Sequence, residues 1–170
     1  MEEIKYWIWF SRIENLTPKT QLELLKQFKN PANLWNKKEE DLIKQKINEK
    51  LAKRICEQKY KKDLDKYLEY MQKNAIELIN IYSQEYPENL KNIYDPPTFL
   101  YIKGNKEILN QKSISIVGCR NCTTYGKNTA MKLAYNLSNN NINIVSGLAR
   151  GIDAYSHIGC LKGKAKTIAV

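Results

Sequence analysis

Two glycine-containing turns in the second half of the chain constrain its fold more than any other feature. Each turn follows a short apolar segment and precedes a helical one, first at Ile116-Val117-Gly118 and again at Val145-Ser146-Gly147. A strand that passes through a turn into an amphipathic helix and returns to a strand is typical of a parallel sheet with helical crossovers. The pattern therefore predicts an α/β Rossmann-like fold for this half.

The predicted elements of this half alternate as βαβαβ. The first strand is almost continuously apolar, which is typical of a strand buried on both faces of a parallel sheet. Because a doubly wound sheet usually has more strands, we expect an incomplete Rossmann-like domain over 75–170, truncated after its third strand. The predicted order is a strand at 113–117, a helix at 124–140, a strand at 142–145, a helix at 153–161 and a strand at 167–170. The first of these helices is expected to bury Ala130, Leu133, Ala134 and Leu137 on one face.

The first half carries helical signals instead. Thr17-Pro18 is a helix start, with threonine as the cap and proline at the first helical position. Asn48 is a second cap, and apolar residues recur at helical spacing up to about residue 74. We predict a small all-α domain over 1–74, whose three tryptophans are core or domain-contact residues rather than base-stacking platforms.

Between these two regions the sequence predicts short, mixed elements. Ile-rich residues 76–81 read as a strand, residues 86–90 open one helical turn, and 98–103 read as another strand after Asp95-Pro96-Pro97. A two-turn helix is predicted at 106–109.

The net charge of +10 indicates a polyanionic partner, but its distribution says more than its size. Lysine is abundant together with isoleucine and asparagine (24, 19 and 18 residues), the amino-acid bias of an AT-rich genome. Residues 83–170 hold 11 basic and 5 acidic side chains, whereas residues 1–82 hold 17 and 13. The uncompensated charge is therefore concentrated in the α/β half.

Both turns have the properties of a phosphate site. Parallel strands bring them to one edge of the sheet, where helix N-termini present amide groups. Gly118 permits close backbone approach, and two of the chain's four arginines, Arg120 and Arg150, offer planar forks that suit phosphate. The predicted anion site also includes Lys127, Ser146 and Gly147. In the alternative interpretation the glycines only make tight turns and Arg150 pairs with Asp153.

Several segments together resemble the DNA-processing protein A (DprA, also called Smf) family over residues 86–170. They keep the family's order and spacing. They are Tyr86-Pro87-Glu88-Asn89-Leu90, Asp95-Pro96-Pro97, Leu100 to Gly104, Ile116 to Arg120, Tyr125-Gly126, Val145 to Asp153, His157, and Thr167 to Val170.

The resemblance implies a cytoplasmic bacterial protein that binds and protects incoming single-stranded DNA in natural transformation and loads the RecA recombinase. It also implies a sterile-alpha-motif-like (SAM-like) N-terminal domain and a homodimer made through further strands beyond this chain. The turn Gly118-Cys119-Arg120 corresponds to the family's backbone-binding turn, and Ser146-Gly147 lines the same pocket. Cys119 replaces the family's usual hydroxyl and is a poorer donor to phosphate.

Other functions fit the residues less well. A nucleotide-binding or nucleotide-hydrolysing enzyme of the lysine-decarboxylase-like (LOG) group is the main alternative, although its Pro-Gly-Gly-x-Gly-Thr segment does not occur. Neither Gly-x-Gly-x-x-Gly nor a phosphate loop is present, so no nucleotide cofactor is expected. A helix-hairpin-helix around Leu16 to Phe28 would lack its glycines.

The remaining reactive side chains suggest no chemistry. Cys119-x-x-Cys122 could form a redox pair, but its flanking elements are in the wrong order for a thioredoxin fold. A zinc site would need a second paired spacing, so no metal is expected. His157, the single histidine, is expected to pair with Asp153 rather than catalyse, and we predict no enzymatic activity. With no signal peptide or membrane span expected, the predicted location is the cytoplasm.

Overall fold

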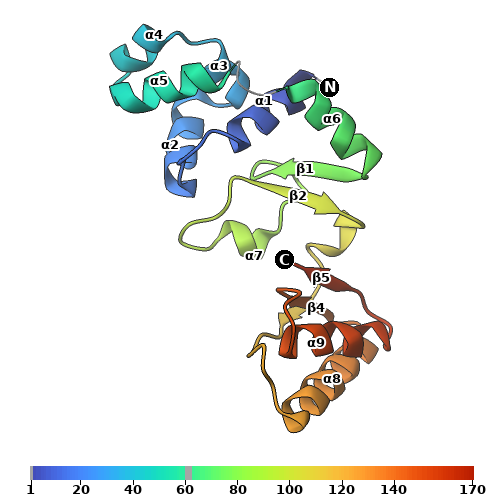
Figure 1. Ribbon diagram of the computed structural model, residues 1–170. Coiled ribbons are helices and arrows are strands. Elements are labelled where there is room, and N and C mark those ends of the chain that lie inside the picture. The colour runs from blue at the N-terminus through green and yellow to red at the C-terminus, as the bar shows by residue number, and fades with distance from the viewer. Residues whose placement is uncertain (1, 60–62) are drawn as a thin grey trace. The chain divides into compact units, whose positions relative to one another are not determined.

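The computed structural model describes residues 2–59 and 63–170, and its chain divides into two compact units. The first, here called the helical unit, covers Met1–Lys106, and the second, the α/β unit, covers Glu107–Val170 (Figure 1). The predicted boundary near residue 74 lies within the first of these units.

The described part of the helical unit begins with six helices, as the helical signals predict; a separate domain over 1–74 and its likeness to a SAM domain stay predictions. Thr17 caps the second helix through its Oγ1, which accepts the Thr20 N–H at 3.2 Å, and Asn48 caps the fifth in the same way. Part of the helix predicted from residue 61 lies outside the described residues. The helices are α1 (Glu2–Ser11), α2 (Pro18–Phe28), α3 (Pro31–Trp35), α4 (Glu39–Lys44), α5 (Glu49–Gln58) and α6 (Leu64–Lys73).

The core of this unit is aromatic and aliphatic. Trp9 and Phe10 of α1 are buried, and the Trp9 ring meets that of Trp35 edge-on with 5.0 Å between centroids. Trp7 is buried in the same cluster, and Trp35 packs against it while partly exposed. Of the two predicted roles, core or domain contact, the three tryptophans have the core role, with Trp35 at its margin.

An antiparallel ribbon completes the helical unit. Strand β1 (Ile76–Asn80) pairs with β2 (Phe99–Lys103), and the short helix α7 (Glu88–Lys91) lies in the connection. Leu78 of β1 packs against the helical core, and the buried Thr98 hydroxyl donates to Gln21 Oε1 of α2 at 2.7 Å. Because these contacts join the ribbon to the helices, the compact unit extends past residue 74 to Lys106.

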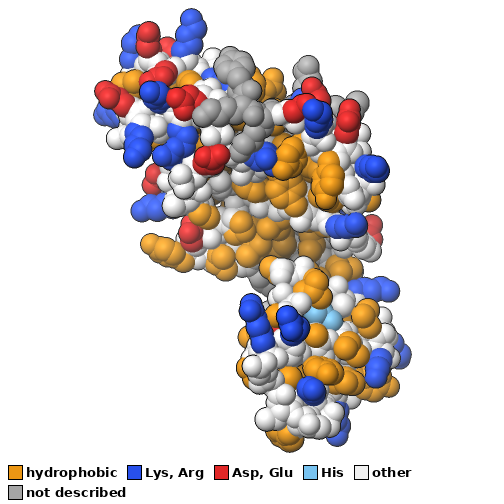
Figure 2. Space-filling model, viewed as in Figure 1, with side chains coloured by type: hydrophobic (Ala, Val, Ile, Leu, Met, Phe, Trp, Pro, Cys, Tyr) orange, Lys and Arg blue, Asp and Glu red, His pale blue; other side chains and the backbone are white. Residues whose placement is uncertain are grey.

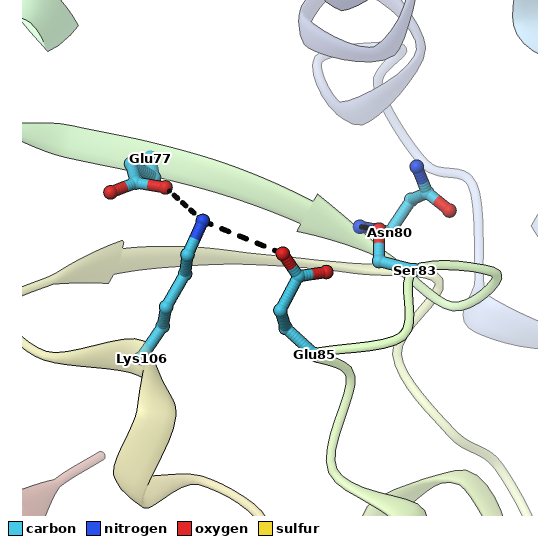
Figure 3. A network of polar contacts seen from close by, with 5 residues as sticks. All are labelled: Glu77, Asn80, Ser83, Glu85 and Lys106. Carbon is cyan, nitrogen blue, oxygen red and sulfur yellow. Dashed lines mark hydrogen bonds and ion pairs between the residues drawn. The ribbon is translucent and has the colours of Figure 1, made fainter.

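A polar network holds the ends of this ribbon (Figure 3). The Lys106 ammonium lies 2.8 Å from Glu77 Oε2 on β1 and 3.5 Å from Glu85 Oε1 in the following loop. Glu77 and Glu85 both raise the pKa of Lys106, with the hydrogen bond to Glu77 as the largest cause. Nearby, the Asn80 N–H donates to the Ser83 hydroxyl at 3.1 Å and shapes the turn after β1.

The α/β unit is built on a parallel three-stranded sheet in the order β3-β4-β5. Helices α8 and α9 pack against each other and against β4, so both crossovers lie on one face of the sheet (Figure 1). Buried Ile116, Ala134, Ile144 and Cys160 form the core between them. This βαβαβ arrangement is compatible with the predicted Rossmann-like fold. The elements are β3 (Ser113–Ser115), α8 (Thr124–Asn139), β4 (Asn143–Ser146), α9 (Ile152–Leu161) and β5 (Thr167–Ala169).

Three expectations for this unit are wrong. Strand β3 is not buried on both faces, since Ser113, Ile114 and Ser115 are all exposed at the edge of the described sheet. Leu133 of α8, expected in the core, is 49% exposed. A single 3-10 turn, η1 (Lys106–Ile108), replaces the predicted two-turn helix at 106–109. Strand β3 pairs on one side only, and helices α8 and α9 pack mainly on β4 rather than on it, which explains the exposure of its residues.

None of the described helices combines the length and the apolar character that a bilayer crossing requires.

Candidate nucleic-acid interface

The two predicted turns lie against each other at the start of α9. The Ile152 N–H donates to the Cys119 carbonyl at 3.3 Å, which joins the second loop to the first. A Cβ built on Gly118 would come within 2.6 Å of the Ile152 side chain, and one on Gly151 would lie 2.3 Å from the Cys119 carbonyl oxygen. Both glycines are therefore required by contact between the loops.

Some backbone N–H groups at the N-termini of α8 and α9 already donate hydrogen bonds within the protein. Thr123 caps α8, and its Oγ1 accepts the Gly126 N–H at 3.1 Å. At α9 the cap residue is Gly151, and the Ala154 N–H donates to the Ala149 carbonyl at 3.1 Å. These hydrogen bonds leave fewer backbone amides for an anion. The side-chain cations therefore contribute more of any anion binding.

A cleft of about 640 Å³ opens between these loops and the first turns of α8 and α9. The lining brings Arg120 and Arg150 together from the two turns, and Lys127 joins them from α8. None of the described residues that line it is acidic. The full lining is Arg120, Asn121, Cys122, Thr123, Lys127, Arg150, Gly151, Ala154, Tyr155 and Ile158.

The other predicted site residues lie beside this cleft and do not line it. Ser146 is buried, and its hydroxyl donates to the Ile116 carbonyl at 2.7 Å, linking β4 to the end of β3. Gly147 lies close to Asp153: a Cβ built on Gly147 would be 2.9 Å from Asp153 Oδ2. Gly118 and the exposed Cys119 form the inner part of the first loop. The structure thus gathers Arg120, Lys127 and Arg150 and leaves these four outside the lining.

The charge around the cleft is strongly positive. Residues 107–170 contain eight basic side chains and two acidic ones, Glu107 and Asp153, and Asp153 is buried. Across 2–59 and 63–170, no ion pair joins Arg150 to Asp153. Figure 2 shows basic side chains on the visible face of this unit, whereas the helical unit carries both signs. The field at the cleft therefore favours a polyanion.

His157 has a structural position rather than the predicted pairing with Asp153. It is buried on α9, and its Nδ1 lies 2.6 Å from Thr167 Oγ1 on β5. That hydroxyl donates to the Ile144 carbonyl at 2.9 Å, so it must accept from the histidine. The ring therefore donates from Nδ1–H, and it joins α9 to β5.

Among the described residues, no three His, Cys, Asp or Glu side chains lie close enough together to hold a metal ion. Cys122 lines the cleft while Cys119 is exposed outside the lining, and both thiols are free.

Sequence reasoning missed the apolar wall of the cleft. Tyr155 lines it one helical turn after Gly151, together with Ala154 and Ile158. No local signal marked it, because helical spacing alone does not show which side of the helix faces the cleft. The Lys127 ammonium lies 5.3 Å from the Tyr155 ring centroid, a cation–π contact between α8 and α9.

Known proteins include several that are similar to this chain. Residues 77–170 match the model of a protein family described as DNA recombination-mediator protein A. The DNA processing protein DprA of Bacillus subtilis is 43% identical over 119 residues, which are 69% of this chain and 40% of that protein. Protein Smf of Synechocystis is 30% identical over 173 residues, covering 99% of this chain and 44% of the relative.

A solved structure is similar over nearly the whole chain. The X-ray structure of DprA from Streptococcus pneumoniae matches with a TM-score of 0.76 at 29% identity, covering 98% of this chain and 56% of that one. The chain thus spans about half the length of these relatives or somewhat less.

Proposed function

The chain belongs to the DNA recombination-mediator protein A (DprA/Smf) family, and from that premise we propose that it binds single-stranded DNA at the cleft of the α/β unit. The observation that carries the proposal is the convergence of Arg120, Arg150 and Lys127 on one cleft without an acidic lining residue. Guanidinium forks suit phosphate, and a cationic groove can follow the backbone of a single strand without reading its sequence.

The interlocked loops support this role because they position the two arginines. Arg120 precedes the α8 cap and Arg150 precedes the α9 cap, so both side chains begin on backbone fixed by loop contact. Fixed cations lose less entropy on binding than mobile ones. Binding led by phosphate contacts would be independent of sequence and would weaken steeply with salt.

The wider role follows from the family rather than from the cleft. Protection of incoming DNA in natural transformation, loading of RecA and assembly as a homodimer are proposed for the whole protein. We propose a binding protein that performs no chemical step. The predicted contributions of Gly118, Cys119, Ser146 and Gly147 act in it through the loop backbone, since their side chains do not line the cleft.

The test is fluorescence anisotropy of a labelled oligo-dT titrated with this chain at several salt concentrations, with duplex DNA as competitor. Arg120→Ala should weaken binding by about 1.5–3 kcal/mol, the range for hydrogen bonds to charged groups. It should also make the logarithmic salt slope shallower by about 0.7, the release expected for one single-strand phosphate.

The matched control is Lys132→Ala, which removes an exposed cation of α8 that is outside the cleft lining. It should weaken binding much less than Arg120→Ala does. Equal losses in the two variants would show that bulk charge, and not the cleft, binds the DNA. Absence of salt-sensitive binding in the unmodified chain would refute the proposed function.

A further inference from the structure

The cleft has two chemically different walls. Arg120, Arg150 and Lys127 make a cationic wall on the loops and the start of α8. On α9, Ala154, Tyr155 and Ile158 make an apolar wall, and Ile158 is 41% exposed. A polyanion recognised by charge alone would need only the first wall. The second wall suits a ligand that carries a flat apolar group beside its phosphate.

The Tyr155 ring lies at the junction of the two walls. The ring is partly buried on α9, and the Lys127 ammonium lies over it, 5.3 Å from the centroid. The ring and the cation therefore stay close together on neighbouring helices. A cation beside an aromatic surface matches the phosphate and the base of a nucleotide.

We propose that Tyr155, flanked by Ala154 and Ile158, is a stacking site for a nucleobase next to the phosphate-binding loops. This inference rests on the proposed function, since it names the part of the DNA that the apolar wall contacts. Every base presents a π face, so stacking on one tyrosine keeps the binding independent of sequence. It also requires an unpaired base, which gives a physical reason for preferring single strands over duplex.

The first experiment compares two ligands of equal charge. Anisotropy is measured with a labelled oligo-dT and with an oligonucleotide of the same length whose sugars carry no bases. The unmodified chain should bind oligo-dT about 5- to 140-fold more tightly, which corresponds to the ~1–3 kcal/mol of one base–aromatic stack at ~1.4 kcal/mol per tenfold. Equal affinity for the two ligands would overturn the inference.

Variants of the ring locate that preference. Tyr155→Leu keeps an apolar side chain but removes the aromatic face, so it should lose most of the preference for oligo-dT over the abasic strand, and Tyr155→Phe should retain it. The control Tyr135→Ala removes a tyrosine of α8 that is 42% exposed and outside the cleft lining, and it should change neither affinity. A Tyr155→Leu protein with an undiminished preference would overturn the inference.

A second measurement needs no variant. An oligonucleotide with 5-iodouracil bases is irradiated in complex with the unmodified chain, and crosslinked peptides are identified by mass spectrometry. Crosslinks at Tyr155 are expected, and crosslinks confined to other residues would refute the stacking site. These results separate the two proposals: salt-sensitive binding without base preference removes only the stacking site, whereas absence of binding removes the proposed function and the stacking site with it.

Discussion

Replacing Gly151 by alanine tests whether the two loops are interlocked. A Cβ at this position would lie 2.3 Å from the Cys119 carbonyl oxygen and 2.4 Å from that of Arg120. Gly151 also has a φ of +91°, a backbone conformation in which an L residue is strained. Because both contacts are with backbone, no side chain can rotate away to relieve them. The substitution therefore combines a steric clash with backbone strain.

Two other glycines separate these contributions. Gly104 has a φ of +115° and nothing within 4 Å of a built Cβ, so Gly104→Ala introduces backbone strain alone, about 1–2 kcal/mol. Gly118 lacks a positive φ, and its Cβ would meet the Ile152 side chain at 2.6 Å, so Gly118→Ala introduces crowding of about 1–3 kcal/mol. Gly151→Ala should lower the free energy of unfolding by about 2–5 kcal/mol, the sum of both.

The assay is urea unfolding followed by far-UV circular dichroism, with hydrogen–deuterium exchange to localise the effect. Gly151→Ala should have the lowest midpoint of the three variants and should lose exchange protection at 118–123 and in the first turns of α9. Its affinity for oligo-dT should fall as well, because the Arg120 backbone must move. A Gly151→Ala protein no less stable than Gly104→Ala would refute the interlocked arrangement.

Two further predictions concern buried hydroxyls of the helical unit. Thr98→Val leaves the buried Gln21 Oε1 without its donor and should lower the free energy of unfolding by about 1–3 kcal/mol. Tryptophan fluorescence in urea measures this, and Thr98→Ser, which keeps the hydroxyl, should lose less; equal losses would contradict the hydrogen bond. Burial raises the pKa of Tyr86 to about 12 from 10.0, and its hydroxyl donates to the Pro97 carbonyl at 2.6 Å. The raised pKa means that the stability this group contributes is complete below pH 10 and lost as pH rises through about 12. In an ultraviolet absorbance titration, Tyr86→Phe should show one tyrosine fewer among those that ionise late. If the missing tyrosine is instead one that ionises near pH 10, the raised pKa of Tyr86 is contradicted.

Local signals in the sequence predicted most of the elements correctly. Thr17-Pro18 and Asn48 begin helices because their side-chain oxygens accept amides that the first helical turn leaves unpaired. The alternation of strand, turn and helix after residue 113 predicted the parallel sheet, since a chain that continues in one direction needs a helical crossover between strands. These features depend on neighbours within a few residues.

Features that depend on distant partners were not predictable in the same way. The exposure of β3 follows from its place at the edge of the described sheet, and strand order is a property of pairing rather than of composition. The extent of the helical unit depends on the hydrogen bond from Thr98 to Gln21, which are far apart in the sequence. Nothing local to residue 74 indicates that the ribbon packs on the helices.

In the candidate site, too, local features were predictable and contacts with distant residues were not. The sequence indicated Arg120, Lys127 and Arg150 because cations in glycine turns suit phosphate, and the structure brings all three to one cleft. The sequence also indicated that Gly118 leaves room for a phosphate, but the close approach at Gly118 is to Ile152. Tyr155 was missed because periodicity places an aromatic residue in a helix without showing what lies across from it.

Because the two loops contact each other, DNA binding should depend on loop residues that do not themselves bind the DNA. Gly118 and Gly151 each meet the other loop, and neither can carry a side chain without displacing the backbone that bears Arg120 or the start of α9. The buried Asp153 carboxylate lies against Gly147, on the inner side of the second loop, so the acidic group nearest in sequence to Arg150 is kept out of the cleft lining. Substitutions at Gly118, Gly147 or Asp153, which do not line the cleft, should therefore reduce DNA binding, as should substitutions at Gly151, because they disturb the spacing of the arginines or the sign of the local charge. In a site that relies on three cations, that spacing decides whether adjacent phosphates of one strand can be bound together.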